Sequence, residues 1–335
     1  MARHVVTRHV VTEVSRDEMG THPAVRAWSD LAATSVEPES VQILRERSKA
    51  SVYRLRGVGA DGGSIIAKRS RAREAALERT VYAELLPQLR VSSPRYYGSS
   101  EDREANCWLF LEDVGSQPYA ISNPEHFALA GRWLGRMHTA ATRIAETAGP
   151  GTALPDGGPG RYLEHLRAGR LNIANSLSKP ALVKREVAVL QALVSLLDRL
   201  EAAWSRLQES CSEMPSTLVH GDFRPKNAYV RCDPSGLMLL PIDWEMAGWG
   251  VPAADLTRVD LASYQAVVRE HWPGIDARAL RRHASMGELF CLLAAIHWES
   301  LSFKYHTRRY LLKATTSMRV YRDRLLRALQ VHGVA

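Results

Sequence analysis

One stretch of this chain reads His220-Gly221-Asp222-Phe223-Arg224-Pro225-Lys226-Asn227, and Asp243-Trp244-Glu245 follows it. It places carboxylates at Asp222 and Asp243 and a carboxamide at Asn227, five residues after the first and sixteen before the second. Apolar segments enter and leave these positions, so we expect the polar side chains on two loops joined by a short strand pair. Carboxylate and amide oxygens suit magnesium, and a carboxylate can accept the proton of an attacking hydroxyl. The spacing indicates phosphoryl transfer from a magnesium nucleotide.

The composition is that of a globular protein, and the chain is long enough for two packed lobes. The chain has 335 residues, of which 45% are hydrophobic and 24% charged. No window approaches the run of about 18 apolar residues that a membrane span needs, so no membrane partner is expected. Residues 1–14 lack the pattern of a secretory signal. The four cysteines are widely spaced without a CxxC motif, which favours reduced thiols and a cytoplasmic location.

The formal charge of +8 raises the question of a nucleic-acid partner. The basic residues are scattered along the chain rather than gathered into one arm or stripe. A solvated basic surface that also suits an anionic nucleotide explains the charge, so no nucleic-acid partner is expected.

The first part of the chain has the pattern of a small antiparallel sheet. After residues 1–35, which we interpret as an extension with a short helix over 22–33, five apolar segments have strand character, and one helix over 71–86 ends at Pro87. The five predicted strands cover residues 41–44, 52–55, 64–67, 94–98 and 107–111.

A GxGxxG match at Gly57, Gly59 and Gly62 is interpreted as a hairpin turn. A dinucleotide fingerprint needs a helix directly afterwards, and a strand follows here. A protein-kinase glycine loop would lie further upstream of Lys68.

Beyond residue 115 the pattern is helical. We expect a helix over 124–146, a buried stripe from Leu190 to Leu207 at three-four spacing, and three helices after residue 253. Strands first and helices afterwards predict an α+β protein. The predicted parts are the extension 1–35, a nucleotide-binding lobe 36–115, and a lobe 116–335 with the catalytic loop, metal site and acceptor pocket.

The two quoted segments resemble those of the aminoglycoside phosphotransferase and choline kinase superfamily. Their HGDxxxxN and IDWE patterns are followed by residues 250–256, which are similar to the GxPxxDL element of that family. The three elements stand in order within about forty residues, which is far more specific than a lone HGD. The resemblance implies a protein-kinase-like fold, with a five-stranded antiparallel sheet and one helix in a small lobe and a larger helical lobe.

The resemblance also implies roles for individual residues. Asp222 is expected to be the catalytic base, and Asn227 and Asp243 the ligands of Mg²⁺. His220 and Gly221 shape the catalytic loop. Asp255 is expected to brace that loop by hydrogen bonds.

In the first lobe, a cation on a rigid strand is needed for the phosphates of ATP. Lys68, at the end of the third predicted strand, meets this need, and Glu78 on the following helix is favoured over Glu74 and Glu84 as its partner.

A serine-bearing segment stands where the family has its phosphate loop, and Ser48 and Ser51 are candidate phosphate contacts. Residues 108–113 resemble the hinge between the lobes, so backbone groups of Leu111 and Asp113 are expected to pair with adenine.

The acceptor is expected to be a small molecule with a hydroxyl group, and the protein a monomer or homodimer. We favour an aminoglycoside-type antibiotic, for which Glu245, Asp260, Glu288 and Glu299 are candidate contacts. Residues 251–335 carry 13 Lys and Arg against 7 Asp and Glu, a poor environment for a polycation.

Another hydroxyl metabolite, such as a sugar, choline or a different antibiotic, is the alternative. A choline-type substrate would need an aromatic cage, which Trp244, Trp249, Trp272 and Trp298 could supply.

A catalytically silent binding protein on the same scaffold is the third possibility. The joint presence of Lys68, Asp222, Asn227 and Asp243 argues against it, because a silent scaffold has no chemical need for all four.

Overall fold

The computed structural model describes residues 12–334, apart from 33–36, 48–49, 103, 149–153, 235 and 306. The chain forms two compact units. The first unit combines residues up to 119 with the segment 225–245, and the second combines 120–224 with 246–335. The predicted boundaries at residues 35 and 115 stay predictions, but the inclusion of 225–245 in the first unit was not anticipated.

The first unit contains an antiparallel sheet of six strands in the order β1-β2-β3-β4-β6-β5. The predicted α+β class is confirmed, but the count of five strands was wrong. The extra strand β1 is a two-residue edge strand, Thr12–Glu13, and so short a polar pair has no apolar alternation by which to predict it. The strands are β1 (Thr12–Glu13), β2 (Val41–Glu46), β3 (Ala50–Leu55), β4 (Ile65–Arg71), β5 (Tyr96–Glu101) and β6 (Asn106–Glu112).

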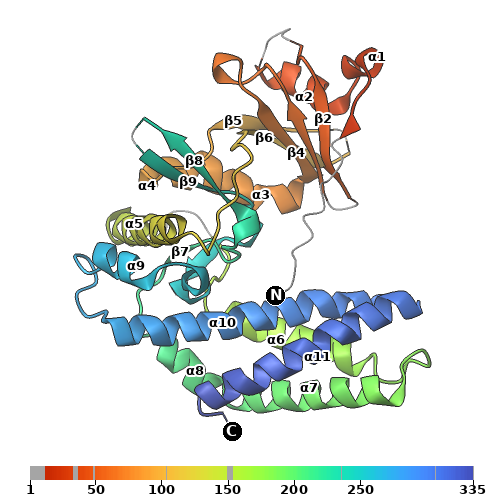
Figure 1. Ribbon diagram of the computed structural model, residues 1–335, viewed down its shortest axis with the longest axis vertical. Helices are drawn as coiled ribbons and strands as arrows, with labels where there is room; N and C mark the ends of the chain where they lie inside the picture. The colour runs from red at the N-terminus through yellow and green to blue at the C-terminus, as the bar shows by residue number, and fades with distance from the viewer. Residues whose placement is uncertain are drawn as a thin grey trace. The chain divides into compact units, whose positions relative to one another are not determined.

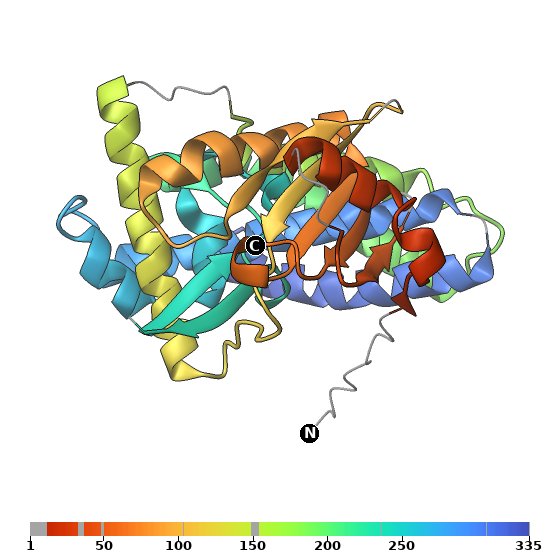
Figure 2. The ribbon, with the colours of Figure 1, turned by 90° about the horizontal axis from the view of Figure 1, so that it is seen from above.

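Side chains of β6 alternate between the two faces of this sheet. Trp108 and Phe110 belong to one cluster with Trp28 of α2 (Pro23–Ala32), and Cys107 and Leu109 belong to another with Ala75. Successive residues of a strand point to opposite faces, so α2 and α3 (Ala72–Thr80) cover different faces. Both helices can be followed in Figure 2, α3 in orange. A short helix α1 (Arg16–Met19) precedes α2.

The helix after β4 continues past Pro87, where the sequence predicted its end. α3 leads into a π-helical turn, Val81–Leu85, and then into α4 (Leu86–Leu89). Pro87 lies in the first turn of α4, a position that tolerates the missing N–H of proline. Gln88 Nε2 donates to the carbonyl oxygen of Glu84 at 2.6 Å and stabilises this irregular turn.

A hairpin of β8 (Ala228–Asp233) and β9 (Gly236–Pro241) completes the first unit. Tyr119 N donates to the carbonyl oxygen of Ala228 at 2.9 Å, and Ser92 Oγ donates to that of Leu239 at 2.8 Å. Arg231 and Glu112 add an ion pair at 2.5 Å. These bonds explain why a segment far along the chain packs with the N-terminal residues.

The second unit is helical apart from a two-stranded sheet of β7 (Thr217–Val219) and β10 (Gly248–Gly250). The predicted stripe from Leu190 to Leu207 is buried on α7 and α8, as expected, and the helix predicted over 124–146 and three later helices are present. No helix among the described residues is long and apolar enough to cross a membrane. The helices, labelled in Figure 1, are α5 (Pro124–Ala148), α6 (Pro159–Ala174), α7 (Lys184–Ala202), α8 (Trp204–Cys211), α9 (Leu261–Val268), α10 (Ala277–Ser300) and α11 (Arg308–Val331).

Candidate active site

Lys68 joins two acidic side chains in the first unit. It lies within β4, between its flanking neighbours β3 and β6, so its backbone is held on both sides. Its Nζ atom is 2.7 Å from Oε2 of Glu78 and 2.8 Å from Oδ1 of Asp243. The structure thus contains the expected contact of Lys68 with Glu78, and it adds Asp243 as a second partner, 175 residues away in sequence.

The environment of these groups favours a charged ammonium. Burial lowers the pKa of Lys68, but the carboxylates of Glu78 and Asp243 outweigh burial and raise this pKa above its usual range. Burial raises the pKa of Glu78, which is 2% exposed, and Lys68 opposes this shift. Lys68 therefore stays positively charged at neutral pH.

Tyr82 is a neighbour that the sequence did not single out. Burial, Glu78 and Asp243 together raise the pKa of its hydroxyl well above the usual range. Tyr82 and Glu78 are each 2% exposed, and an environment of this low polarity strengthens the electrostatic interaction of Glu78 with Lys68.

Asp243 has an unusual backbone conformation. Its φ angle is +67°, a left-handed value that few residues other than glycine adopt. The preceding residue, Ile242, donates its N–H to the carbonyl oxygen of Asn227 at 2.8 Å, which fixes the end of β9 against the start of β8. Backbone strain of this kind is concentrated at functional sites, where the surrounding structure holds it in place.

Asn227 and Asp243 fit a magnesium ion in chemical type. The hydrogen bond from Ile242 brings the two segments together within the first unit, and they offer an amide oxygen and a carboxylate. Magnesium takes hard oxygen ligands and keeps several waters or phosphate oxygens, so two protein ligands are sufficient. Among the described residues there is no cluster of three or more His, Cys, Asp or Glu side chains able to hold a metal.

The loop that carries Asp222 belongs to the second unit and is held in place by hydrogen bonds to a buried carboxylate. The carboxylate of Asp255, which is fully buried, accepts the N–H groups of His220 at 2.7 Å and Gly221 at 3.0 Å. The predicted bracing role of Asp255 is therefore confirmed. Gly221 has φ +74°, and a Cβ there would overlap the carbonyl oxygen of Met246, so only glycine fits.

Arg224 and Trp298 also lie at this loop, although neither was predicted to have a role at Asp222. A guanidinium nitrogen of Arg224 forms an ion pair with Oδ1 of Asp222. The Cζ atom of Arg224 is 5.7 Å from the ring centroid of Trp298, an arrangement typical of a cation–π contact. Arg224 thus connects the predicted base to α10.

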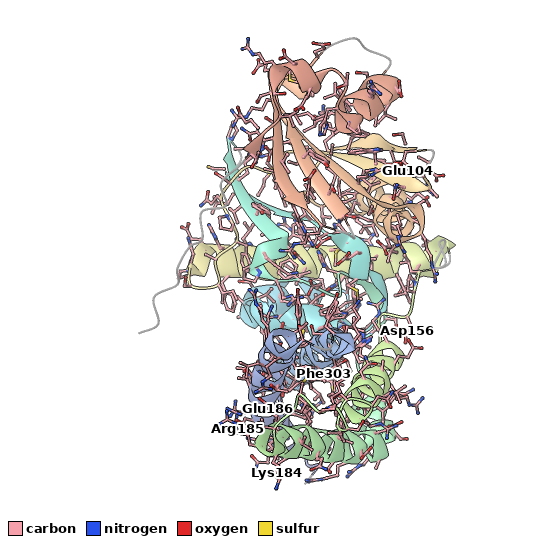
Figure 3. The ribbon with its side chains drawn as sticks, turned by 90° about the vertical axis from the view of Figure 1, so that its right-hand side faces the viewer. Glu104, Asp156, Lys184, Arg185, Glu186 and Phe303 are labelled. Atoms are coloured by element: carbon pink, nitrogen blue, oxygen red, sulfur yellow. The ribbon has the colours of Figure 1, made fainter. Side chains whose placement is uncertain are left out.

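Arg161 braces the same region from α6. Its two terminal nitrogens donate to the carbonyl oxygens of Met246 at 2.6 Å and Ala247 at 2.9 Å. Asp156, at the start of α6 in Figure 3, accepts the N–H groups of Gly158 at 2.7 Å and Arg161 at 2.8 Å and so fixes the first turn of this helix.

A pair of histidines lies next to Trp298. The Nδ1 atoms of His165 and His297 are 2.7 Å apart, and the rings of His165 and Trp298 pack edge to face at 5.9 Å. Burial, then His297 and Arg161, lowers the pKa of His165 to about 4. Burial also lowers the pKa of His297. Both rings are therefore uncharged at neutral pH.

The remaining predicted nucleotide contacts stay predictions. Ser48 lies outside the described residues, and Ser51 lies in β3 opposite Arg69. Leu111 is part of β6, and the N–H of Asp113 donates to the carbonyl oxygen of Ser64 at 3.2 Å. An adenine base that accepted from the N–H of Asp113 would compete with the carbonyl oxygen of Ser64 for this donor.

The candidate acceptor acids have different environments. Asp260 caps α9 by accepting from Ala262 N and Ser263 N, so its carboxylate is already hydrogen-bonded to the start of this helix. Glu288 is exposed, Glu299 is half-buried, and Glu245 contributes to the raised pKa of Glu78.

An aromatic cage is not supported by the tryptophans. Trp244 is fully buried, and Trp272 is also buried, so both are core residues. The ring of Trp298 already forms a cation–π contact with Arg224. Trp249 is half-buried in β10.

Comparison with known proteins agrees with this description. Residues 41–289 match the model of the phosphotransferase enzyme family, so the chain belongs to this family. This membership confirms the predicted family and the predicted class of enzyme, a small-molecule kinase. None of the curated proteins matches the chain.

Solved structures share the kinase-like fold at low sequence identity. Choline kinase from Cryptosporidium parvum Iowa II is 12% identical, with a TM-score of 0.58 over 88% of this chain and 91% of that chain. The GDP complex of wild-type aminoglycoside 2'-phosphotransferase-IIIa is 15% identical, with a TM-score of 0.58 over 90% and 99%. A microcompartment-associated aminopropanol kinase is 19% identical, with a TM-score of 0.59 over 88% and 94%. The predicted fold class is thereby confirmed.

Proposed function

We propose that this chain transfers the γ-phosphoryl group of magnesium-bound ATP to a hydroxyl group of a small molecule. The observation that carries the proposal is the bridge in which Lys68 contacts both Glu78 and Asp243. A lysine fixed on a strand by a buried acid is placed to bind nucleotide phosphates as a point charge. The GDP complex among the similar structures is consistent with nucleotide use.

The other predicted residues take roles that suit their chemistry. Asp222 accepts the proton of the acceptor hydroxyl, and the hydrogen bonds from His220 and Gly221 to Asp255 keep its loop rigid. Asn227 and Asp243 would hold magnesium, which when bound neutralises charge on the phosphate oxygens. Ser51 contacts the phosphates, and Leu111 and Asp113 contact adenine.

An aminoglycoside-type antibiotic is the first acceptor to test, which would make the protein a resistance enzyme. Its support is family membership and the presence of aminoglycoside kinases among the similar folds, one of them a complex with GDP and kanamycin.

A neutral or weakly charged hydroxyl compound is the second candidate. Two features favour this second candidate. Arg224 forms an ion pair with Asp222, and the uncharged rings of His165 and His297 lie beside Trp298. Asp260 is engaged as a helix cap, which removes one carboxylate that a polycation would need. Neutral imidazoles can exchange hydrogen bonds with sugar hydroxyls, and a tryptophan face can pack against a sugar ring.

A screen of ATP consumption tests both candidates. Purified protein is incubated with aminoglycosides, choline, amino sugars and neutral sugars, each with magnesium, and ADP release is followed. Asp222→Asn should lower turnover by about 10²- to 10⁴-fold while nucleotide affinity stays unchanged. The exposed Asp198→Asn on α7 serves as the control and should keep full activity.

The outcomes separate the alternatives. Turnover with an aminoglycoside alone supports the first candidate, and turnover with neutral sugars supports the second. Nucleotide binding without turnover of any acceptor would indicate a silent scaffold. Full activity of Asp222→Asn would exclude Asp222 as the base.

A further inference from the structure

A cavity of about 520 Å³ lies within the second unit. Its walls come from α8, the first turns of α10, and the end of α11 with the residues after it. In Figure 1 the end of α11 lies beside α8, close to the mark of the C-terminus. Cavities of this size hold small organic ligands. None of the residues proposed above for phosphoryl transfer lines it.

The cavity has a strong positive charge. Four arginines line it, whereas Glu213 is the single acidic residue among the described lining residues. Glu213 is already paired with Arg282 at 2.5 Å. The described residues form no ion pair with the other three arginines, which are Arg206, Arg278 and Arg281.

The three arginines of α10 are placed against the preference of an isolated helix. Arg281 and Arg282 lie three and four residues after Arg278, so each is a surface neighbour of Arg278, and like charges at these spacings repel. They also lie in the first two turns, and cations are unfavourable at the positive end of the helix dipole. Arg282 pairs with Glu213, and Arg282 and Arg278 both help to lower the pKa of Asp276 at the helix start. Arg281 has no ion pair with a described residue and is the most open of the three to an anionic ligand.

A buried histidine adds a polar group to the lining. His283 is 2% exposed, and its Nε2 atom is buried without a hydrogen-bond partner among the described residues. Burial lowers the pKa of this ring, so it is neutral and has one donor and one acceptor nitrogen. A buried polar atom of this kind is normally paired, so Nε2 of His283 is open to a hydrogen-bond partner in the cavity.

Apolar side chains form another part of the wall. Leu207 and Met286 line the cavity and are each 4% exposed, and Val331 and Val334 line it as well. Leu207, Met286 and Val334 already pack in the core, whereas Val331 is 70% exposed and is the apolar surface that an organic body would cover.

We infer that this cavity binds a small organic molecule that carries clustered oxyanion groups, such as a phosphorylated or diphosphorylated metabolite. The arginines bind the oxyanions, and Val331 packs against the organic part. Arginines that line a concave volume with apolar walls suit a small ligand better than nucleic acid, which needs a stripe along a surface. This site is additional to the proposed phosphotransfer function.

Isothermal titration calorimetry with inorganic pyrophosphate, without magnesium, tests the anion-binding part. All proteins carry Lys68→Gln, so that the nucleotide site contributes little, and binding is measured directly rather than through activity. Arg278→Gln with Arg281→Gln should weaken pyrophosphate binding by roughly tenfold or more. The control is Arg309→Gln with Arg319→Gln, two exposed positions on α11 that lower the net charge equally and should leave the affinity unchanged.

Three results would overturn the inference. The first is that the Lys68→Gln protein does not bind pyrophosphate. The second is that the Arg278 and Arg281 variant keeps its affinity for pyrophosphate. The third is that this variant and the Arg309 and Arg319 control lose affinity equally. For the organic part, phenyl phosphate should bind more tightly than inorganic phosphate; equal affinity would contradict it. Binding of a short DNA duplex that depends on Arg278 and Arg281, without binding of small phosphates, would assign the surface to nucleic acid.

Discussion

The Nζ atom of Lys68 lies 2.7 Å from Oε2 of Glu78, which connects the middle of β4 to the helix that follows it. The acid is 2% exposed and the lysine side chain 15% exposed, so the pair is shielded from water. Shielding strengthens the attraction, and it also makes the loss of one partner costly to the other.

Glu78→Gln should weaken nucleotide binding without unfolding the first unit. The amide keeps the shape of the side chain but no longer orients the ammonium by charge, so we expect ATP affinity to fall by about tenfold. Titration calorimetry with magnesium-ATP measures this affinity. Glu74→Gln, an exposed position on the same helix, is the matched control. Equal affinities of both variants and the wild type would show that the pair has no role in nucleotide binding.

Asp243→Asn should remove the dependence of nucleotide binding on magnesium. Asparagine tolerates the left-handed conformation at φ +67° better than alanine, so the substitution tests the charge rather than the backbone. In the wild type, chelation of magnesium with EDTA should weaken ATP binding by about tenfold or more. In the variant the affinities with and without EDTA should agree. A magnesium effect as large as that of the wild type would contradict the assignment of this ligand.

Gly221→Ala should destabilise the second unit strongly. The added Cβ meets the carbonyl oxygen of Met246 and also makes the φ angle of +74° unfavourable. We expect a loss of about 3 kcal/mol or more in the free energy of unfolding, measured by urea denaturation. Gly333→Ala has a similar φ of +65° with open space around the Cβ, and it should lose only about 1 kcal/mol. Equal losses would show that the contact with Met246 has no effect.

The stability of the second unit should fall in mild acid because of His165. Its pKa is lowered to about 4, whereas the imidazole of the unfolded chain titrates near 6.5. The unfolded state therefore binds more protons between these values, and the contribution is fully present above pH 6.5 and lost as the pH falls toward 4.

His165→Asn should reduce this dependence. After allowance for solvent screening, we expect the variant to lose about 1 to 2 kcal/mol less than the wild type between pH 6.5 and 4. Urea denaturation at several pH values gives the slope. The exposed His271→Asn should keep the slope of the wild type, and an unchanged slope in His165→Asn would exclude its contribution.

Much of the fold could be predicted because its signals are local. The buried stripe of α7 and α8 follows from the three-four spacing of leucines, and the strands of the first unit follow from short apolar runs. Two failures have local causes as well. β1 is too short and polar to predict, and a π-helical turn lets the helix pass Pro87.

The candidate site was predicted in part. Glu78 was favoured as the partner of Lys68, and the structure contains this contact. The second partner, Asp243, was predicted only as a metal ligand, because no pattern connects residues 175 positions apart. Arg224 and Trp298, and His165 and His297, are likewise brought together by packing.

The strands and helices other than β1, the chemical groups of the candidate site and the family of the chain could all be predicted from the order of the amino acids. These properties depend on residue type and short spacings, which any single stretch of chain already contains. Tertiary packing is needed to bring Asp243 to Lys68, to place residues 225–245 in the first unit, and to line one cavity with four arginines. Such contacts join residues far apart in sequence, and their energy arises only when the whole chain packs and excludes water.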